Sequence, residues 1–378
     1  MAGTASLPFA GASILAVACL ATAAVAPAPT AFALALPTVR LCRPRCEHHR
    51  ADANDCAALF ASSGDTSREK FAGDEWRESD TNLETDQRYL RFSGVGRLYS
   101  SVDDSLSSEE SDRSSAHLSI VDRLTASTCA VIGIGGVGSW AAEALCRSGV
   151  GNIILIDLDD ICISNVNRQL HATTTTVGSS KVDTMRMRLQ DINPACNITE
   201  IFDFVTLDNI DQIMDKIPHD AVVLDCIDGQ REKAALIVAC HARQISVVTC
   251  GGAAGRTDPT QVVCADITRV NDDRLIFSTR KLLRKQYGWP KGPAQGEKNN
   301  HKVKAWNIPA VFSTELQRAA PAPIAGASSL RQCDGPLGTA CFLTGTYGFV
   351  AAGKVVDMIA TDIRQAPKKP KIYQKEQK

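Results

Sequence analysis

The sequence predicts an α/β fold with a doubly wound, mostly parallel sheet of the Rossmann-like kind. Short apolar runs alternate with segments of helical pattern from residue 129 onward, as in parallel sheets covered by helices. The first run ends in a glycine-rich turn, Gly133 to Gly138, and the next ends in an acid, Asp157. A strand, glycine turn, helix, strand and acid in this order indicate a nucleotide-binding unit.

The remaining elements follow the same alternation. We expect strands at 129–132, 152–157, 197–202, 221–225, 245–250 and 261–265, and helices at 139–147 and 231–243. The segment from Leu337 to Ala360 is largely apolar but contains Lys354 and Asp357. We therefore expect a buried helix that packs on the sheet, with membrane association through this segment as the alternative.

Composition limits the function classes. The 378 residues carry 41 basic and 42 acidic side chains, a net charge of −1. That balance excludes a globally basic nucleic-acid binder but not a local basic patch. The 14 cysteines are scattered and form no CxxC pair. A zinc site built from two such pairs is excluded, so no zinc is expected.

The sequence of the N-terminal part is typical of a targeting segment and not of a folded domain. Residues 13–27 are apolar and Ala-rich, and several arginines follow from Arg40 onward. We interpret 1–40 as an organelle-targeting presequence, for a plastid or a mitochondrion; a leader without targeting function is the alternative. Residues 41–88 are polar and mixed and are predicted to be a linker. An acidic, Ser-rich stretch, 100–115, is predicted to be an exposed insertion.

Polar and charged residues after the second strand point to adenylation. The motif SNVNRQ contains Asn165, Arg168 and Gln169; Lys181 and Asp228 come later. Cations beside a phosphate site stabilise the charge on a triphosphate as pyrophosphate leaves, and a carboxylate holds Mg²⁺. A dehydrogenase would need only the acid that binds the ribose.

These motifs, in this order, resemble the ThiF/MoeB/ubiquitin-activating superfamily, from about Arg88 to Ala360. Within this superfamily, five segments are similar in sequence to the branch of tRNA threonylcarbamoyladenosine dehydratases. They are VIGIGGVGSWAAEAL, IDLDDICISNVNRQLHA, GGAAGRTDPTQ, VFSTE and TGTYGFVAA. The resemblance implies an adenylation domain at 89–364, ATP and Mg²⁺ as cofactors, and a homodimer.

The resemblance also implies roles for single residues. Four glycines would cradle the ATP phosphates, namely Gly133, Gly135, Gly136 and Gly138. Asp157 would bind the ribose hydroxyls and Asp159 would belong to the nucleotide site. Asn165, Arg168 and Lys181 would contact the triphosphate with Gln169 nearby, and Asp228 would lie by the α-phosphate and Mg²⁺. The partner subunit would supply an arginine, with Arg97 as the first candidate and Arg91 as the second.

Simpler interpretations stay open for several of these residues. Asp159 would serve equally well as the cap of a turn, and Asp228 as a turn residue before the next helix. Arg168 would otherwise form a surface ion pair, and Lys181 would be an ordinary exposed lysine. We assign no catalytic role to His171.

The implied activity is ATP-dependent cyclisation of threonylcarbamoyladenosine in tRNA, beside the anticodon, through an acyl-adenylate. The alternatives are activation of the C-terminus of a ubiquitin-like or sulfur-carrier protein, and a non-catalytic nucleotide-binding scaffold. No motif supports a sulfur-carrier or desulfurase partner, because Ala310 stands where bacterial relatives have a cysteine before VFSTE.

A basic segment supports tRNA as the substrate. Between Arg269 and Lys304, ten basic residues oppose three acids, a local charge of +7, and residues 365–378 form a basic tail. Tyr287, Trp289 and Trp306 are interleaved with these charges and are predicted to stack on bases. A solvated, charged helix and loop is the alternative.

Overall fold

The computed structural model describes residues 76–100, 110–290, 304–318 and 337–370, with side chains from 87 in the first range and from 118 in the second. All of them belong to one compact unit, Ala72–Lys378. The predicted presequence 1–40, residues 41–75 of the predicted linker, residues 101–109 of the insertion and residues 291–303 of the basic segment lie outside the described residues.

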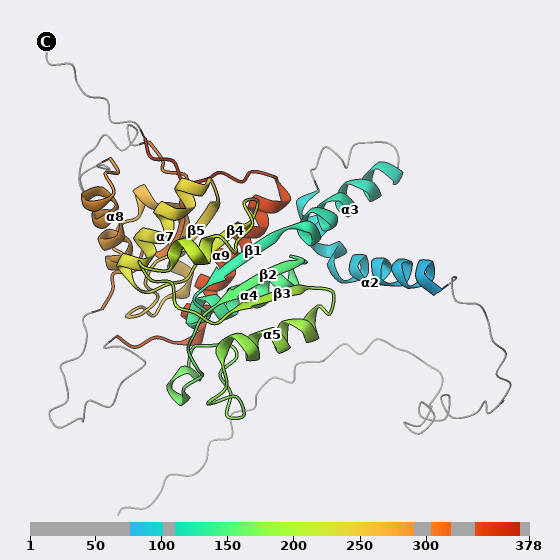
Figure 1. Cartoon of the computed structure of the whole chain (residues 1–378), viewed down its shortest axis with the longest axis horizontal. Helices are drawn as coiled ribbons and strands as arrows, with labels where there is room; N and C mark the ends of the chain where they lie inside the picture. The colour runs from blue at the N-terminus through green and yellow to red at the C-terminus, as the bar shows by residue number, and fades with distance from the viewer. Residues whose placement is uncertain (1–75, 101–109, 291–303, 319–336, 371–378) are drawn as a thin grey trace, which may run out of the picture. The chain divides into compact units, whose positions relative to one another are not determined.

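A seven-stranded sheet forms the centre of this unit, with the order β3-β2-β1-β4-β5-β7-β6 (Figure 1). Its strands are β1 Thr128–Ile132, β2 Asn152–Ile156, β3 Asn197–Ile201, β4 Val222–Asp225, β5 Ser246–Cys250, β6 Val262–Asp266 and β7 Pro309–Ser313. All neighbours pair in parallel except β6 and β7, which are antiparallel. The prediction of a mostly parallel, doubly wound sheet is confirmed.

Helices cover both faces of the sheet. They are α2 Trp76–Tyr99, α3 Glu110–Ala126, α4 Gly136–Arg147, α5 Lys181–Ile192, α6 Ile210–Met214, α7 Gln230–Arg243, α8 Arg274–Gln286 and α9 Cys341–Ala360. Apolar residues of α3, α4, α5 and α9 pack on one face, and those of α6, α7 and α8 on the other. In β1, Cys129 and Val131 face the first group while Ala130 and Ile132 face the second. Burial on both faces explains why these strands are continuously apolar.

The apolar C-terminal segment forms the predicted buried helix. Tyr347 and Val355 of α9 are fully buried in the core, and Lys354 forms an ion pair with Asp357 (Nζ–Oδ2 2.7 Å). Within the described ranges, no helix is long and apolar enough to cross a membrane.

Two predicted boundaries differ from the structure. Helix α2 begins at Trp76, inside the segment predicted as linker, and α3 begins at Glu110, inside the predicted insertion. Both helices are polar along most of their length, so their sequences show little apolar periodicity. Phe92 is nevertheless buried, and a Cβ added to Gly149 would lie 3.0 Å from its ring. Phe92 ties α2 to the turn that follows α4, and Val95 and Tyr99 of α2 pack against the core as well.

The prediction that Trp289 and Trp306 stack on bases is wrong. Both indoles are at least 97% buried and contact each other with ring centroids 4.9 Å apart. Tyr287 packs against the same apolar cluster. The spacing of aromatic residues among charges does not show which way a ring points, and here both indoles belong to the core.

Candidate active site

A pocket of about 520 Å³ opens where the parallel strands end. The chain runs outward from β1 toward β2 in one direction and toward β4 in the other, and such a reversal leaves a crevice at the carboxyl ends of the strands. The pocket is lined by residues that follow each of the strands β1 to β5, and by residues from the beginnings of α8 and α9.

The glycine-rich turn forms the floor of the pocket at the start of α4. Gly133 has a φ of +88°, a conformation that favours glycine. Gly135 and Gly136 line the pocket, and a Cβ at Gly136 would lie 2.9 Å from Thr344 Cγ2. The absence of side chains leaves the first backbone amides of α4 accessible, which is the arrangement that binds phosphates.

Gly138 has a different position from the other three glycines. It is buried in α4 and does not line the pocket. A Cβ at this residue would lie 1.9 Å from the carbonyl oxygen of Gly133. Gly138 therefore permits close packing of α4 against the turn, and the structure gives no support for a direct phosphate contact.

Asp157, Asp159 and Lys181 form a charged cluster beside the turn. Asp157 accepts hydrogen bonds from the amides of Ile134 (2.7 Å) and Asp159 (2.9 Å). Lys181 Nζ lies 2.6 Å from Asp159 Oδ2 and 3.8 Å from Asp157 Oδ1. Burial raises the pKa of Asp157, against the opposing effect of the Lys181 charge. Lys181 is 95% buried, so it is not the ordinary exposed lysine of the simpler interpretation.

The SNVNRQ motif places three polar residues on the pocket wall. Asn165 accepts from the amide of Cys162 (3.0 Å). The carbonyl of Arg168 accepts from Trp140 Nε1 (3.0 Å) and Thr344 Oγ1 (2.9 Å), and its guanidinium donates to Ser164 O (2.6 Å). Arg168 lines the pocket, and its guanidinium also donates to Asn167 Oδ1 (3.1 Å).

Gln169 carries a buried acceptor within the same pocket. Its Oε1 atom is buried and accepts no hydrogen bond within the described part of the chain, and its Nε2 lies 3.9 Å from where a Cβ of Gly135 would be. A buried polar group without a partner is costly. Phosphate oxygens only accept, so this Oε1 would need a donor such as a hydroxyl or amino group of a bound ligand, whereas the Nε2 of Gln169 is the atom that would donate to a phosphate.

Asp228 lies at the mouth of the pocket, after β4. Its side chain is exposed and lines the cavity. The amide of the preceding residue, Ile227, donates to the buried carboxylate of Asp225 (3.1 Å). Within the described ranges, no three His, Cys, Asp or Glu side chains are grouped so as to hold a metal.

The arginines predicted to come from a partner lie outside this pocket. Arg97 is exposed on α2, and Arg91 donates to the carbonyl of Ile192 (3.1 Å). Neither lines the cavity of its own chain. His171 is buried and its Nε2 contacts Ile134 O (2.9 Å), which agrees with a structural histidine behind the turn.

Several lining residues were not predicted from the sequence. Phe204 follows β3, Gly251 to Ala254 follow β5, and Thr344 belongs to α9. Gly251 to Ala254 belong to the motif GGAAGRTDPTQ, and Thr344 belongs to TGTYGFVAA. Both motifs were recognised in the sequence, but nothing in them indicated that these residues line the pocket. Cys226 and Cys250 also line the cavity. The neighbouring thiol of Cys250 and, to a smaller extent, burial raise the pKa of Cys226, so it is a poor nucleophile.

Comparison with known proteins identifies what this chain is similar to. The model of the ThiF family matches residues 111–369. The tRNA threonylcarbamoyladenosine dehydratase of Haemophilus influenzae is 39% identical over 71% of this chain and 93% of its own length. That of Escherichia coli is 41% identical over 62% and 87%. The crystal structure of the E. coli enzyme, TcdA, with ATP shares 35% identity and a TM-score of 0.58, over 72% of this chain and 95% of that one.

Proposed function

The chain belongs to the ThiF family, and we propose that it uses ATP to dehydrate threonylcarbamoyladenosine in tRNA, beside the anticodon. One observation carries the proposal: Lys181, Arg168 and the glycine turn, from three separate segments, line one pocket at the start of α4. That is the charge arrangement that a triphosphate requires. Relatives named as this dehydratase match 71% and 62% of the chain.

The pocket divides into a nucleotide side and an opposite side. On the nucleotide side, the amides at the start of α4 would bind phosphate oxygens, and Lys181 and Arg168 would balance the negative charge on them. Asn165 and Gln169 would add polar contacts. The carboxylate of Asp157, held by the amides of Ile134 and Asp159, would face the ribose.

Asp228 is the proposed ligand of Mg²⁺. Its side chain is exposed at the pocket mouth, and the loop that carries it is tied to the buried Asp225. Bound Mg²⁺ would neutralise charge on the phosphates and so favour the departure of pyrophosphate. Asp159 is already paired with Lys181 and is a less suitable ligand.

The proposed chemistry has two steps and needs no cysteine. The carboxylate of the threonyl group attacks the α-phosphorus of ATP, which gives an acyl-adenylate and releases pyrophosphate. The carbamoyl group then attacks the activated acyl carbon, closes a ring and releases AMP, so that the nucleoside loses one water overall. The second step is intramolecular and therefore fast. Ala310 is buried in β7 and excludes thioester or persulfide chemistry at that position.

Helix α8 is the proposed surface for tRNA. Arg274, Lys281 and Lys285 are exposed on it, together with the aromatic ring of Phe277. Arg280 does not belong to this surface, because its guanidinium is directed inward and donates to the carbonyls of Ile267 and Thr268 (both 3.2 Å).

The basic tail reaches the end of the same helix. Lys369 Nζ donates to the carbonyl of Tyr287, just after α8 (2.8 Å). The two basic segments recognised in the sequence therefore meet at one place, although they are distant along the chain. A concentrated positive patch on an otherwise neutral protein suits an RNA backbone.

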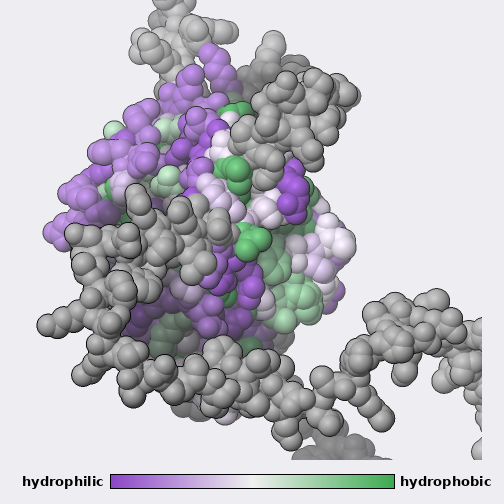
Figure 2. All heavy atoms as spheres, turned by 90° about the vertical axis from the view of Figure 1, so that its right-hand side faces the viewer, coloured by the Kyte–Doolittle hydropathy of each residue, from purple (hydrophilic) through white to green (hydrophobic). Residues whose placement is uncertain are grey.

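A homodimer is the proposed assembly. Large apolar side chains are exposed on α2 and α9, at Leu90, Leu98, Phe342 and Phe349. Figure 2 shows small hydrophobic groups among hydrophilic residues on the side that is at the right in Figure 1. A second copy covering such residues would bring Arg97, or else Arg91, near the partner's pocket.

Residues 1–40 are proposed to direct the chain to a plastid or mitochondrion.

The test is mass spectrometry of nucleosides after tRNA bearing threonylcarbamoyladenosine is incubated with protein and Mg·ATP. We expect loss of one water that depends on ATP and is abolished by Arg168→Ala and by Lys181→Met. Arg186→Met is the matched control on α5, because Arg186 pairs with Glu200 (Nε–Oε1 2.9 Å) outside the pocket.

Two outcomes would contradict the proposal. One is full activity of the Arg168 and Lys181 variants. The other is an unchanged nucleoside combined with pyrophosphate exchange that a protein ending in Gly-Gly stimulates, which would assign the chain to activation of a carrier protein instead.

A further inference from the structure

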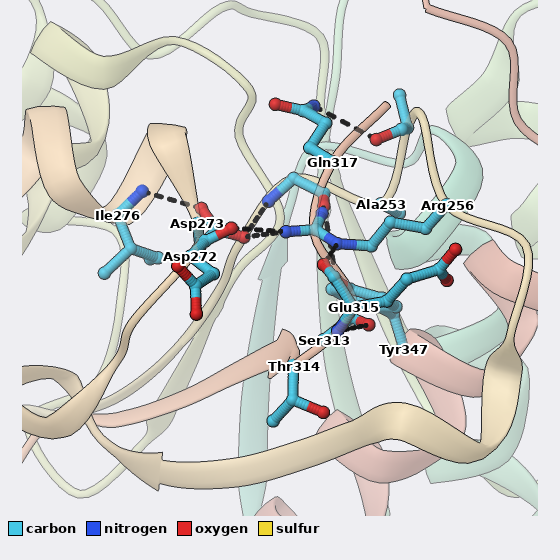
Figure 3. Close-up of polar contacts among 12 residues, drawn as sticks. Ala253, Arg256, Asp272, Asp273, Ile276, Ser313, Thr314, Glu315, Gln317 and Tyr347 are labelled. Atoms are coloured by element: carbon cyan, nitrogen blue, oxygen red, sulfur yellow. Dashed lines mark hydrogen bonds and ion pairs between the residues drawn. The ribbon is translucent and has the colours of Figure 1, made fainter. Parts of the chain in front are cut away.

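A buried arginine lies behind the pocket wall that follows β5. The side chain of Arg256 is 99% buried and that of Asp273 fully buried, and their Nη2 and Oδ2 atoms are 3.4 Å apart. Arg256 also donates to the carbonyls of Glu315 (Nε, 3.1 Å), Asp272 (Nη2, 3.2 Å) and Gly252 (Nη1). Figure 3 shows the guanidinium between these segments. The Arg256 side chain thus joins two other parts of the chain, at Asp272–Asp273 and at Glu315, to its own loop.

The contacts of this pair converge on the peptide groups of Gly252. Its amide donates to Asp273 Oδ2 (3.0 Å), and its carbonyl accepts from Arg256 and from Tyr347 Oη (3.2 Å). A Cβ on Gly251 would lie 2.3 Å from Asp273 Oδ2. Gly251 to Ala254 line the pocket, so the position of this wall depends on the buried pair.

Asp273 also begins the basic helix. Its Oδ1 accepts from the amide of Ile276 (2.9 Å) and caps α8. The next two residues are Arg274, which is exposed, and Leu275, which lines the pocket. A single carboxylate therefore connects the pocket wall with the start of the proposed tRNA surface.

The wall lies across the pocket from the nucleotide residues. The glycine turn and Asp157 follow β1 and β2, whereas Gly251 follows β5, on the other side of β4. A nucleotide bound at the turn and Asp157 leaves the β5 side for the second substrate.

We propose that Arg256 and Asp273 are positioning residues for the tRNA substrate. They hold the wall Gly251–Ala254 and the start of α8 in one fixed arrangement, so that tRNA bound on α8 presents its modified nucleoside to the ATP. Neither side chain touches a reactant. This inference rests on the proposed function and adds the element that aligns the acyl substrate.

The first variant is Asp273→Asn, which keeps the size of the side chain and an oxygen to cap α8. Its amide group would face the Gly252 amide and the Arg256 guanidinium, donor against donor. We expect the rate of water loss at saturating tRNA to fall by about tenfold or more, as misplacement of a substrate does. The KM for ATP should stay within about twofold, since no nucleotide contact is altered.

The second variant separates positioning from stability. Arg256→Met alone leaves Asp273 buried and unpaired, and should lower the melting temperature. The double variant Arg256→Met/Asp273→Asn removes both charges, so its melting temperature should be higher than additivity of the single changes implies. Its rate of water loss should remain as low as that of the single variants.

The matched control is Arg243→Met, which removes an arginine paired with Asp211 and Asp215 on the surface (2.9 and 3.1 Å) and should leave the rate unchanged. Variants with a normal rate overturn the inference, as does a rate that recovers together with stability in the double variant, or a parallel loss of ATP binding. If the wild type itself removes no water, the proposed function fails and this inference fails with it.

Discussion

Lys233 and Asp225 form an ion pair without any exposed surface, with Nζ and Oδ2 2.8 Å apart. Thr249 Oγ1 donates to the same carboxylate oxygen (2.6 Å). The other oxygen accepts from the amide of Ile227, which directly precedes Asp228. The buried pair therefore fixes the end of β4, and with it the proposed Mg²⁺ ligand.

Replacement of Lys233 by Met should destabilise the fold strongly. It leaves the Asp225 carboxylate buried without its cation, which costs about 3–5 kcal/mol of unfolding free energy. Denaturation with urea would measure the loss. Lys354→Met removes a half-exposed ion pair and should cost at most about 1 kcal/mol. Equal losses in the two variants would contradict the prediction.

Replacement of Gly138 by Ala should disrupt the packing of α4 against the glycine turn. The new methyl would lie 1.9 Å from Gly133 O, so α4 or the turn must shift, with a loss of about 3 kcal/mol or more. We expect weaker ATP binding by calorimetry as well. Gly353→Ala is the control: a Cβ there meets nothing within 4 Å, and alanine should stabilise α9. A Gly138→Ala protein that binds ATP normally would disprove the packing role.

His171 should make stability depend on pH. Burial lowers the pKa of His171 from 6.5 to about 4, so the unfolded chain binds a proton more readily than the folded one. This contribution to stability is complete above pH 6.5 and is lost as the pH falls toward 4.

The test is urea denaturation at pH 7.5 and pH 5.5. Between these values, wild type should lose about 1 kcal/mol more than His171→Gln. His219→Gln removes an exposed histidine and should behave like wild type. An identical pH dependence of wild type and His171→Gln would show that the histidine titrates normally.

Charge reversal on α8 should weaken tRNA binding without affecting ATP. Lys281→Glu should lower tRNA affinity several-fold and reduce the salt dependence of binding by about one unit of slope. The control is Lys216→Glu, an exposed lysine after α6. Filter binding at several salt concentrations would compare them. Equal effects of the two substitutions would mean that only net charge matters.

The parallel part of the fold was predictable because its strands are short apolar runs with clear ends in the sequence. Each expected strand occurs within one or two residues of its predicted place, since glycine turns and acids mark where strands end. Strand β7 was recognised only as the motif VFSTE, because a five-residue apolar run has no periodicity that distinguishes it. Helix α2 was not predicted because it is polar along most of its length, so that too few apolar residues mark a helical period.

Side-chain pairing across long sequence distances was beyond prediction. Spacing alone could not show that Lys233 reaches Asp225, or that Arg256 is enclosed by residues as distant as Glu315. The two tryptophans were misassigned because an aromatic residue among charges looks the same whether its ring points outward or inward. The residues of the proposed phosphate site were easier to bring to one pocket, since they form contiguous motifs beside strand ends.

The order in which the chain is synthesised matters for this pocket. The carbonyl of Arg168 is held by Thr344 of α9, and a Cβ at Gly348 would lie 2.8 Å from Val137 O, so α9 lies tightly on α4. The nucleotide-binding segments leave the ribosome long before α9 does. A nascent or prematurely terminated chain that ends before Thr344 thus lacks the contact that holds its SNVNRQ loop, so this wall of the pocket is complete only after α9 has been synthesised.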